Sequence, residues 1–331
     1  MNLTWLDPER LDPRDAAEAV GLLEASRVVD APHDPSTTVA GFSTNLRHGW
    51  GGEAPITALA RDPRGRAYGV LDVDFPRWDN PHVGMLGVTI DPELRRQGLG
   101  TALFEAGMER IRADGRSLVL VFAFDAPAPN GFAKAMGLDR GSEEVQRRQD
   151  LRALDWARLD REYAAAVERS TGYQLVRLTG ATPEDMVAEI ARMTEAINDA
   201  PTDDLQVEDE VFTPERIRAF EAAQAAHRRR VYRLVARERE TGALAGHTMV
   251  GVDGDRPWLG WQYDTSVLRA HRGHRLGLLL KIGMLRWLAA EEPALRRLDT
   301  WNAASNAHMI KVNEILGYRV VAQAIAWQRR L

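Results

Sequence analysis

Two glycines and a cluster of donor side chains stand where an apolar segment gives way to a helical pattern in the first half of the chain. Gly98 and Gly100 follow an expected strand over residues 83–90 and open an expected helix over residues 98–113. The first turn of a helix has unpaired N–H groups and partial positive charge, and glycines let a phosphate approach them. Further donors come from Arg95, Arg96 and Gln97. The segment therefore predicts a pyrophosphate-binding loop.

A related segment follows an apolar strand in the second half of the chain. Arg272 and Gly277 stand 177 residues after Arg95 and Gly100. Arg275 replaces the first glycine, which places a side chain at the turn but keeps a backbone N–H and adds a guanidinium that can contact phosphate. The whole segment consists of Arg272, Gly273, His274, Arg275, Leu276 and Gly277. We interpret it as a modified version of the first loop.

The elements around the two loops recur in the same order. Each half has an expected strand, two helices, three strands, the helix after the loop, a strand, a short helix and a last strand. The dipeptides Asp12-Pro13, Thr182-Pro183 and Thr213-Pro214 are typical of capped helix starts. A chain of 331 residues also suits two domains of ordinary size. The pattern predicts two copies of one α/β fold in tandem.

The first loop resembles the signature of the GNAT superfamily of acyl-CoA N-acyltransferases. That signature is Gln or Arg, two residues, Gly, one residue, then Gly or Ala, after a strand. Arg95, Gly98 and Gly100 match it in full. Arg272 and Gly277 match it in part.

A second family motif, an Asn before a helix that ends in Gly and an aromatic residue, also occurs in each half. Asn306, Gly317 and Tyr318 match it, and Asn130 and Gly137 form a shorter counterpart. The chain is thus similar to tandem-domain GNAT N-acetyltransferases, as in the mycothiol synthase-like proteins.

The resemblance implies a fold class and a domain organisation. We expect an α/β protein with two tandem GNAT-like domains, each a mixed, mostly antiparallel sheet flanked by helices. The expected domains span residues 1–151 and 171–331, with residues 152–170 as a linker.

The resemblance also implies that acetyl-CoA is the co-substrate. The strand before each loop and the strand after the next helix would splay apart, and pantetheine would pair with exposed backbone near Val88 and Ile90 or near Thr265 and Val267. Besides these positions and the donors named above, the implied contacts are Leu99, Thr101, Leu276, Asn130 and Asn306.

Catalytic candidates lie in the second half. An amine must lose a proton before it attacks the acyl carbon, so a base is needed near the acyl site. Tyr263 and Asp264 lie in the strand before the second loop. Strand alternation places Asp264 on the face away from the expected site, from which it would reach the site only across a bulge. The Tyr that protonates the CoA thiolate in many family members is replaced by Ala133 and Asn313.

The acceptor is expected to be a small-molecule primary amine, with a cationic amine as one alternative. An acidic run over residues 198–210 lies between the first two expected helices of the second half, where family members form the acceptor side. The alternative interpretation is a solvated loop.

Composition excludes several classes. The formal net charge is -5, and the arginines are scattered rather than gathered in one stripe, which argues against nucleic-acid binding. The chain has no cysteine, and its histidines lack metal-ligand spacing, so no metal is expected. No leader or membrane segment is predicted, and a cytoplasmic protein is expected. Trp258, Trp261, Trp287 and Trp301 fall in strand or helix patterns and are expected in the core.

Three functions remain open from the sequence. The main one is acetyl transfer from acetyl-CoA to an amine by direct attack in a ternary complex. The alternatives are a non-catalytic acyl-CoA-binding or sensing protein, and a chain with one active and one structural copy.

Overall fold

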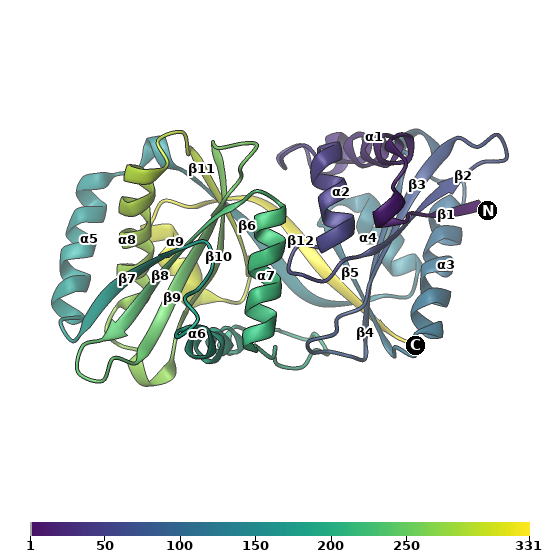
Figure 1. Ribbon diagram of the computed structural model, residues 1–331. Coiled ribbons are helices and arrows are strands. Elements are labelled where there is room, and N and C mark those ends of the chain that lie inside the picture. Colours follow the sequence, from purple (N-terminus) through teal and green to yellow (C-terminus); the bar gives the residue numbers. More distant parts are fainter. Residues whose placement is uncertain (1) are drawn as a thin grey trace. The chain divides into compact units, whose positions relative to one another are not determined.

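A computed structural model describes residues 2–331 (Figure 1). The chain forms two compact units. Unit 1 comprises residues 2–144, Thr202–Asp209 and Ala322–Leu331, and unit 2 comprises Val145–Pro201 and Glu210–Val321. Each unit has a mixed, mostly antiparallel sheet flanked by helices, which confirms the expected fold class.

Unit 1 has its strands in the order β1-β2-β3-β4-β5-β12-β6. β4 and β5 pair in parallel, whereas the registered pairs β1–β2, β2–β3, β3–β4 and β5–β12 are antiparallel. The elements of this unit are β1 (Asn2–Trp5), α1 (Pro13–Asp30), α2 (Val39–His48), β2 (Ile56–Arg61), β3 (Ala67–Asp74), β4 (Val83–Ile90), α3 (Leu99–Ala113), β5 (Leu118–Phe124), α4 (Pro127–Ala135), the first half of β6 (Asp139–Asp150) and most of β12 (Arg319–Arg330).

Helices cover both faces of the unit 1 sheet. Successive residues of a strand point to opposite faces of the sheet, so neighbouring positions of one strand belong to different cores. On one face α3 buries Leu103, Phe104 and Met108 against Leu71. On the other face α1 and α2 pack against Val70.

Unit 2 has its strands in the order β6-β11-β10-β9-β8-β7. The elements are the second half of β6, α5 (Trp156–Arg169), β7 (Tyr173–Thr179), α6 (Val187–Thr194), α7 (Pro214–Ala226), β8 (Arg230–Glu238), β9 (Leu244–Val252), β10 (Leu259–Val267), α8 (Leu276–Glu291), β11 (Arg297–Ala303) and α9 (Ala307–Ile315). The expected linker over residues 152–170 therefore contains α5, which packs on α8.

The central helix of unit 2 is buried along most of its length. On α8, both Leu280 and Ile282 are fully buried in a core that also contains residues of α5, β8 and β9. The opposite face of the sheet packs on α6 and α7. Trp287 is buried as expected, but Trp258 is 39% exposed because it precedes the first residue of β10.

Most predicted helix starts are confirmed, and one is wrong. The Asp12 and Thr213 side chains cap α1 and α7, each with Pro at the first helical position. Thr182-Pro183 caps no helix, since α6 begins only at Val187. Instead, the Thr182 backbone bonds to side chains of α7. The Thr182 N–H donates to Glu221 at 2.8 Å, and Arg218 donates to the Thr182 carbonyl at 2.7 Å.

In each unit the two parallel strands diverge soon after they meet. In unit 1, β4 and β5 pair only from Val83–Leu118 to Met85–Leu120. In unit 2, β10 and β11 pair only from Leu259–Arg297 to Trp261–Asp299. All four strands continue beyond these pairs, so each unit has the splayed opening that the family resemblance implies.

The last strand of each half lies in the compact unit of the other half. Residues 324–330 of β12 pair antiparallel with β5 in unit 1. The second half of β6 is a neighbour of β11 in unit 2, where the Leu151 N–H donates to the Arg296 carbonyl at 2.9 Å. Within residues 2–331, no helix is long and apolar enough to cross a membrane.

Candidate functional site

The loop before α3 has the geometry of an open helix start. Gly98 is the N-cap residue with φ 80°, and no side chain caps the helix. Arg96 is also left-handed, with φ 66°. Arg96, Gln97 and Gly98 are exposed, as a phosphate-binding loop requires.

Unlike the exposed Arg96 and Gln97, Arg95 bonds to other side chains of unit 1. Its guanidinium donates to both carboxylate oxygens of Asp30 on α1, at 2.9 and 2.6 Å, and to the Ser26 hydroxyl at 2.9 Å. Although burial acts to raise the pKa of Asp30, these bonds hold it below its usual value. Arg95 also donates to the Ile90 carbonyl at 3.3 Å. It therefore anchors the loop to α1 and β4.

The loop before α8 has the same backbone with its residue types exchanged. Arg275 is the left-handed N-cap with φ 57°, and Gly273 has φ 87°. These two positions correspond to Gly98 and Arg96, so each loop uses one glycine and one arginine in left-handed conformation. A Cβ added at Gly98 would meet nothing within 4 Å, which explains why arginine fits at the equivalent turn.

The side chains of the second loop point to other partners. Arg275 donates to Glu162 on α5 at 2.8 Å. Arg272 repeats the role of Arg95: it donates to the Val267 carbonyl at 3.1 Å and pairs with Asp199. The His274 ring contacts the Arg169 carbonyl at 3.2 Å. The first turn of α8 thus has no side-chain cap.

The strands before the loops differ in one feature. In unit 1, β3 and β4 pair in unbroken register from Gly69–Ile90 to Asp74–Met85. Ile90 is buried in the core, and Val88 packs against the same core. In unit 2, the register between β9 and β10 shifts between Gln262 and Thr265. Only unit 2 therefore has a bulge at the expected acyl site.

Gln262 stabilises this bulge. Its side-chain amide is buried and donates to the Met249 carbonyl at 2.8 Å, to the Thr248 hydroxyl at 3.1 Å and to the Thr265 hydroxyl at 3.3 Å. The two hydroxyls also bond to each other at 2.7 Å. The amide replaces ladder bonds that the extra residue removes.

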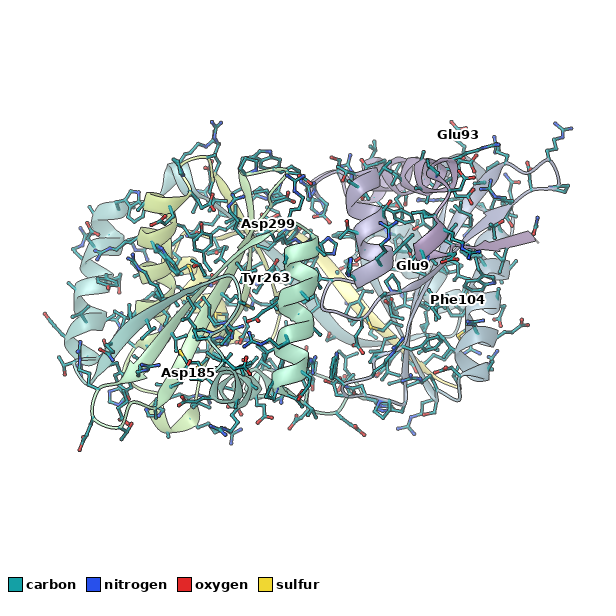
Figure 2. All side chains as sticks on the ribbon, in the orientation of Figure 1. Glu9, Glu93, Phe104, Asp185, Tyr263 and Asp299 are labelled. Carbon is teal, nitrogen blue, oxygen red and sulfur yellow. The ribbon has the colours of Figure 1, made fainter. Side chains whose placement is uncertain are left out.

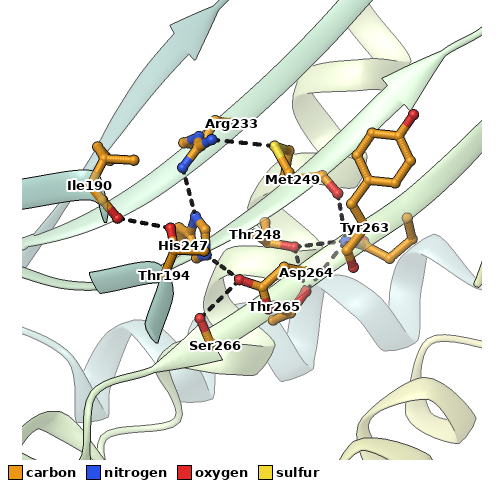
Figure 3. Close-up of polar contacts among 11 residues, drawn as sticks. Ile190, Thr194, Arg233, His247, Thr248, Met249, Tyr263, Asp264, Thr265 and Ser266 are labelled. Carbon is orange, nitrogen blue, oxygen red and sulfur yellow. Dashed lines mark hydrogen bonds and ion pairs between the residues drawn. The ribbon is translucent and has the colours of Figure 1, made fainter. Parts of the chain in front are cut away.

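The bulge directs Asp264 into a polar cluster (Figure 3). Its Oδ2 atom contacts His247 Nε2 and accepts from the Ser266 hydroxyl at 3.1 Å. Its Oδ1 atom is buried and has no hydrogen-bond partner among the described residues. A buried carboxylate oxygen without a donor is rare, so this atom is a candidate for contact with a substrate N–H.

His247 contacts the Asp264 carboxylate, and Arg233 in turn contacts His247. Arg233 Nη1 lies 3.3 Å from His247 Nδ1, and both side chains are buried. Because a guanidinium only donates, Nδ1 accepts, and a neutral ring then carries its proton on Nε2 and donates it to Asp264. Burial lowers the pKa of Arg233, while Glu221 and Asp264 act to raise it. The two residues fix the orientation of Asp264.

Tyr263 lies beside Asp264 but points to α7 (Figure 2). Its hydroxyl donates to Gln224 Oε1 at 2.9 Å. Burial raises the pKa of Tyr263 to about 12. The phenol therefore stays protonated near neutral pH and can donate a proton, but it is a poor base there.

The two Asn residues differ in position: Asn306 precedes its helix as predicted, whereas Asn130 lies inside one. Asn306 caps α9 by accepting from the Met309 N–H at 3.1 Å. Asn130 lies within α4 and donates to Asp125 at 2.6 Å. Both side chains thus make hydrogen bonds within their own segments.

Asn313, the position of the missing Tyr, contacts a buried lysine that sequence reasoning missed. Lys281 Nζ on α8 donates to Asn313 Oδ1 at 2.7 Å and lies 5.0 Å from the Tyr318 ring. Asn313 Nδ2 donates to Asn302 on β11 at 2.8 Å. Burial lowers the pKa of Lys281 to about 7. A lysine inside an apolar helix pattern was the available signal.

Unit 1 contains a pair of acids that sequence reasoning also missed. Asp72 and Asp74 on β3 line a cavity of about 320 Å³ together with Phe42 and Thr57. The Thr57 hydroxyl donates to Asp72 at 2.5 Å, and burial raises the pKa of Asp72. Burial, with repulsion from Asp72 and Glu53, raises the pKa of Asp74 to about 6. Two acids at alternate positions of an apolar strand would have been the signal.

The acidic run is divided between the units. Residues 202–209 belong to unit 1, where the Glu208 N–H donates to Asn80 at 2.7 Å and the Gln206 N–H donates to Gln328 at 2.9 Å. Asp199 stays in unit 2 and pairs with Arg269 and Arg272. Throughout residues 2–331, no group of three or more His, Asp or Glu side chains could hold a metal ion.

Comparisons with known proteins agree with this architecture. Residues 28–138 match the family described as "Acetyltransferase (GNAT) family". No curated protein matches the chain. A solved tandem GNAT protein from the clavulanic acid biosynthesis pathway has a TM-score of 0.81 and 24% identity, covering 99% of this chain and 98% of that one.

A second solved structure supports the same fold. A GCN5-related N-acetyltransferase from Sphaerobacter thermophilus has a TM-score of 0.67 and 17% identity, covering 99% of this chain and 95% of that one. The chain therefore has the tandem GNAT fold along its whole length, and its first copy matches the GNAT acetyltransferase family.

Proposed function

We propose that this protein transfers an acyl group, preferably acetyl, from acyl-CoA to a primary amine of a small molecule, and that unit 2 carries the reaction. The observation that carries the proposal is the bulge in β10. It places a buried, unpartnered oxygen of Asp264 on the strand that borders the splayed opening.

The residues of unit 2 fit an acyl-CoA. The uncapped first turn of α8, with Gly273, Arg275 and Gly277 in or beside it, offers N–H groups to a pyrophosphate. Beyond Trp261, the edge of β10 that faces β11 has no strand partner, so its backbone can pair with pantetheine and donate to the acyl carbonyl. When bound, acyl-CoA supplies a thioester whose carbon forms the new C–N bond while its C–S bond breaks.

Asp264 is the proposed proton acceptor. Its Oδ1 atom attracts an ammonium group and removes the proton that makes the amine unreactive. His247 and Ser266 hold Oδ2, so Oδ1 alone can turn to the amine. This arrangement favours a cationic acceptor, because an uncharged one would leave the buried carboxylate without a partner.

Unit 1 is a candidate for binding rather than for catalysis. Its loop before α3 is open, with exposed Arg96, Gln97 and Gly98. Its β4 has no bulge toward β3, and Asp72 is bonded to Thr57. We therefore assign acyl transfer to unit 2 and a second acyl-CoA contact to unit 1.

Release of the CoA thiol tests the proposal. Wild-type protein with acetyl-CoA and a panel of diamines, aminosugars and amino acids should release thiol with at least one acceptor. Asp264→Asn keeps the shape of the side chain but removes its basicity, and we expect kcat to fall by roughly 10²–10⁴. Asp185→Asn, an equivalent change at an exposed position of unit 2, should leave kcat unchanged (Figure 2).

Two outcomes would contradict the proposal. Full activity of Asp264→Asn would remove the assigned base. Tight acetyl-CoA binding with no thiol release from any acceptor would instead support a binding or sensing protein, the function that the missing Tyr at Asn313 favours.

A further inference from the structure

Unit 2 has a cavity at the far end of its parallel strands. The cavity has a volume of about 560 Å³ and lies where β10 and β11 begin. The splayed opening lies at the other end of the same strands, beyond Trp261 and Asp299. The residues that matter here are Arg148, Gln149, Arg152, Trp258, Arg296 and Arg297.

Positive charge exceeds negative charge around this cavity. Arg148 and Arg297 share one fully buried carboxylate, Asp299, with Nε–Oδ1 distances of 2.9 Å for each. Arg152 pairs with Asp150 at 2.9 Å. Arg296 is exposed and forms no ion pair among residues 2–331. The lining of the cavity thus contains four arginines and one acidic residue, Asp150, which suits an anion.

The walls of the cavity suit a flat apolar group. Trp258 is 39% exposed and lies beside Pro257 and Ala294. Exposed indole rings bind flat rings and guanidinium planes by stacking. Gln149, which is fully buried, also lines the cavity. Its amide donates to the Leu316 carbonyl at 2.6 Å, and its Oε1 atom has no partner among the described residues.

We propose that this cavity binds an organic anion that carries a flat ring, such as an aromatic phosphate or carboxylate. Arg296 binds the anionic group, since a guanidinium matches the two oxygens of a phosphate or carboxylate. Trp258 stacks on the ring. The site is separate from the acyl-CoA site, because the paired segments of β10 and β11 lie between them.

Calorimetric titration of the full-length protein with phenyl phosphate and with benzoate tests this site. Either probe should bind at one site per chain, and benzyl alcohol should not bind. Arg296→Glu should weaken binding roughly tenfold or more, because it replaces the donor with a like charge. Trp258→Ala should weaken it about threefold to tenfold. Arg161→Glu makes the same charge change at an exposed position of α5 and should have no effect.

A second titration in saturating acetyl-CoA separates the two sites. Unchanged affinity for the probe supports the proposal. Displacement by acetyl-CoA would show that the probe occupies the acyl-CoA site, and the proposal would fail. It would also fail if neither probe bound up to about 10 mM, or if Arg296→Glu and Arg161→Glu bound equally well.

Discussion

Lys281 makes a quantitative prediction about stability and pH. The residue is 3% exposed, and Asn313 is its only hydrogen-bond partner among residues 2–331. Burial lowers the pKa of Lys281 from 10.5 to about 7. Between these two values the unfolded chain binds more protons than the folded one. Stability must therefore rise as the pH increases from about 7 toward 10.5.

The size of the effect follows from the two pKa values. Each unit of separation corresponds to about 1.4 kcal/mol, and between pH 7 and pH 9 the linkage gives a gain of about 2 kcal/mol in the free energy of unfolding. Lys281→Met keeps the length of the side chain and removes the titration. The difference between wild type and variant should therefore change by about this amount over the interval.

Urea unfolding followed by tryptophan fluorescence at pH 7 and pH 9 measures this difference, because unit 2 contains Trp287 and Trp301. Lys311→Met, on the exposed side of α9, is the matched control and should follow the wild type at both pH values. The reasoning would be refuted if the free energies of unfolding of wild type and Lys281→Met differed by the same amount at pH 7 and pH 9, since Lys281 would then not be titrating in the folded state.

Three further predictions concern the sites themselves. Gln262→Leu should destabilise unit 2 by roughly 2–3 kcal/mol in urea titrations, because it leaves buried acceptors at the bulge unpaired, and it should lower thiol release in rate assays. The control Gln174→Leu, on the exposed side of β7, should change neither stability nor thiol release. In steady-state kinetics, Gly277→Trp should raise the KM for acetyl-CoA more than tenfold with little change in kcat. The control Gly172→Trp, in open space on a turn, should leave both constants unchanged. Asp74→Asn should stabilise unit 1 by about 2 kcal/mol at pH 7 and not at pH 4, because the raised pKa of Asp74 makes the stability of the wild type fall as the pH rises through about 6. Thermal melts measure this difference, and equal stabilities of variant and wild type at pH 7 would count against it.

The sequence predicts the architecture better than the chemistry, for a physical reason. The strands, most helix starts and the start of α3 after Gly98 follow from local patterns and agree with the structure, whereas the helix start at Thr182-Pro183 does not. The bulge that turns Asp264 depends on Gln262 meeting Met249 and Thr248 on a neighbouring strand, which no local pattern records. The anticipation that Asp264 needs a bulge agrees with the structure, but His247 could be found only from the strand pairing.

The exchange of a residue at the second loop illustrates the same limit. In the sequence, Arg275 stands where the first loop has Gly98. The structure places Arg275 and Gly273 in left-handed conformations that correspond to Gly98 and Arg96. The backbone conformation is thus shared, and only the position of the glycine differs. Spacing alone cannot reveal this, because the space around each Cβ is a tertiary property.

The position of β12 has a consequence for synthesis. The ribosome completes the other strands of unit 1 by residue 150, but β5 receives its antiparallel neighbour only from residues 324–330. Until then the edge of β5 is open, and an open strand edge invites pairing with other chains. Unit 1 can become complete only after residues 324–330 have been made, so deleting these residues should damage the half of the protein that is translated first.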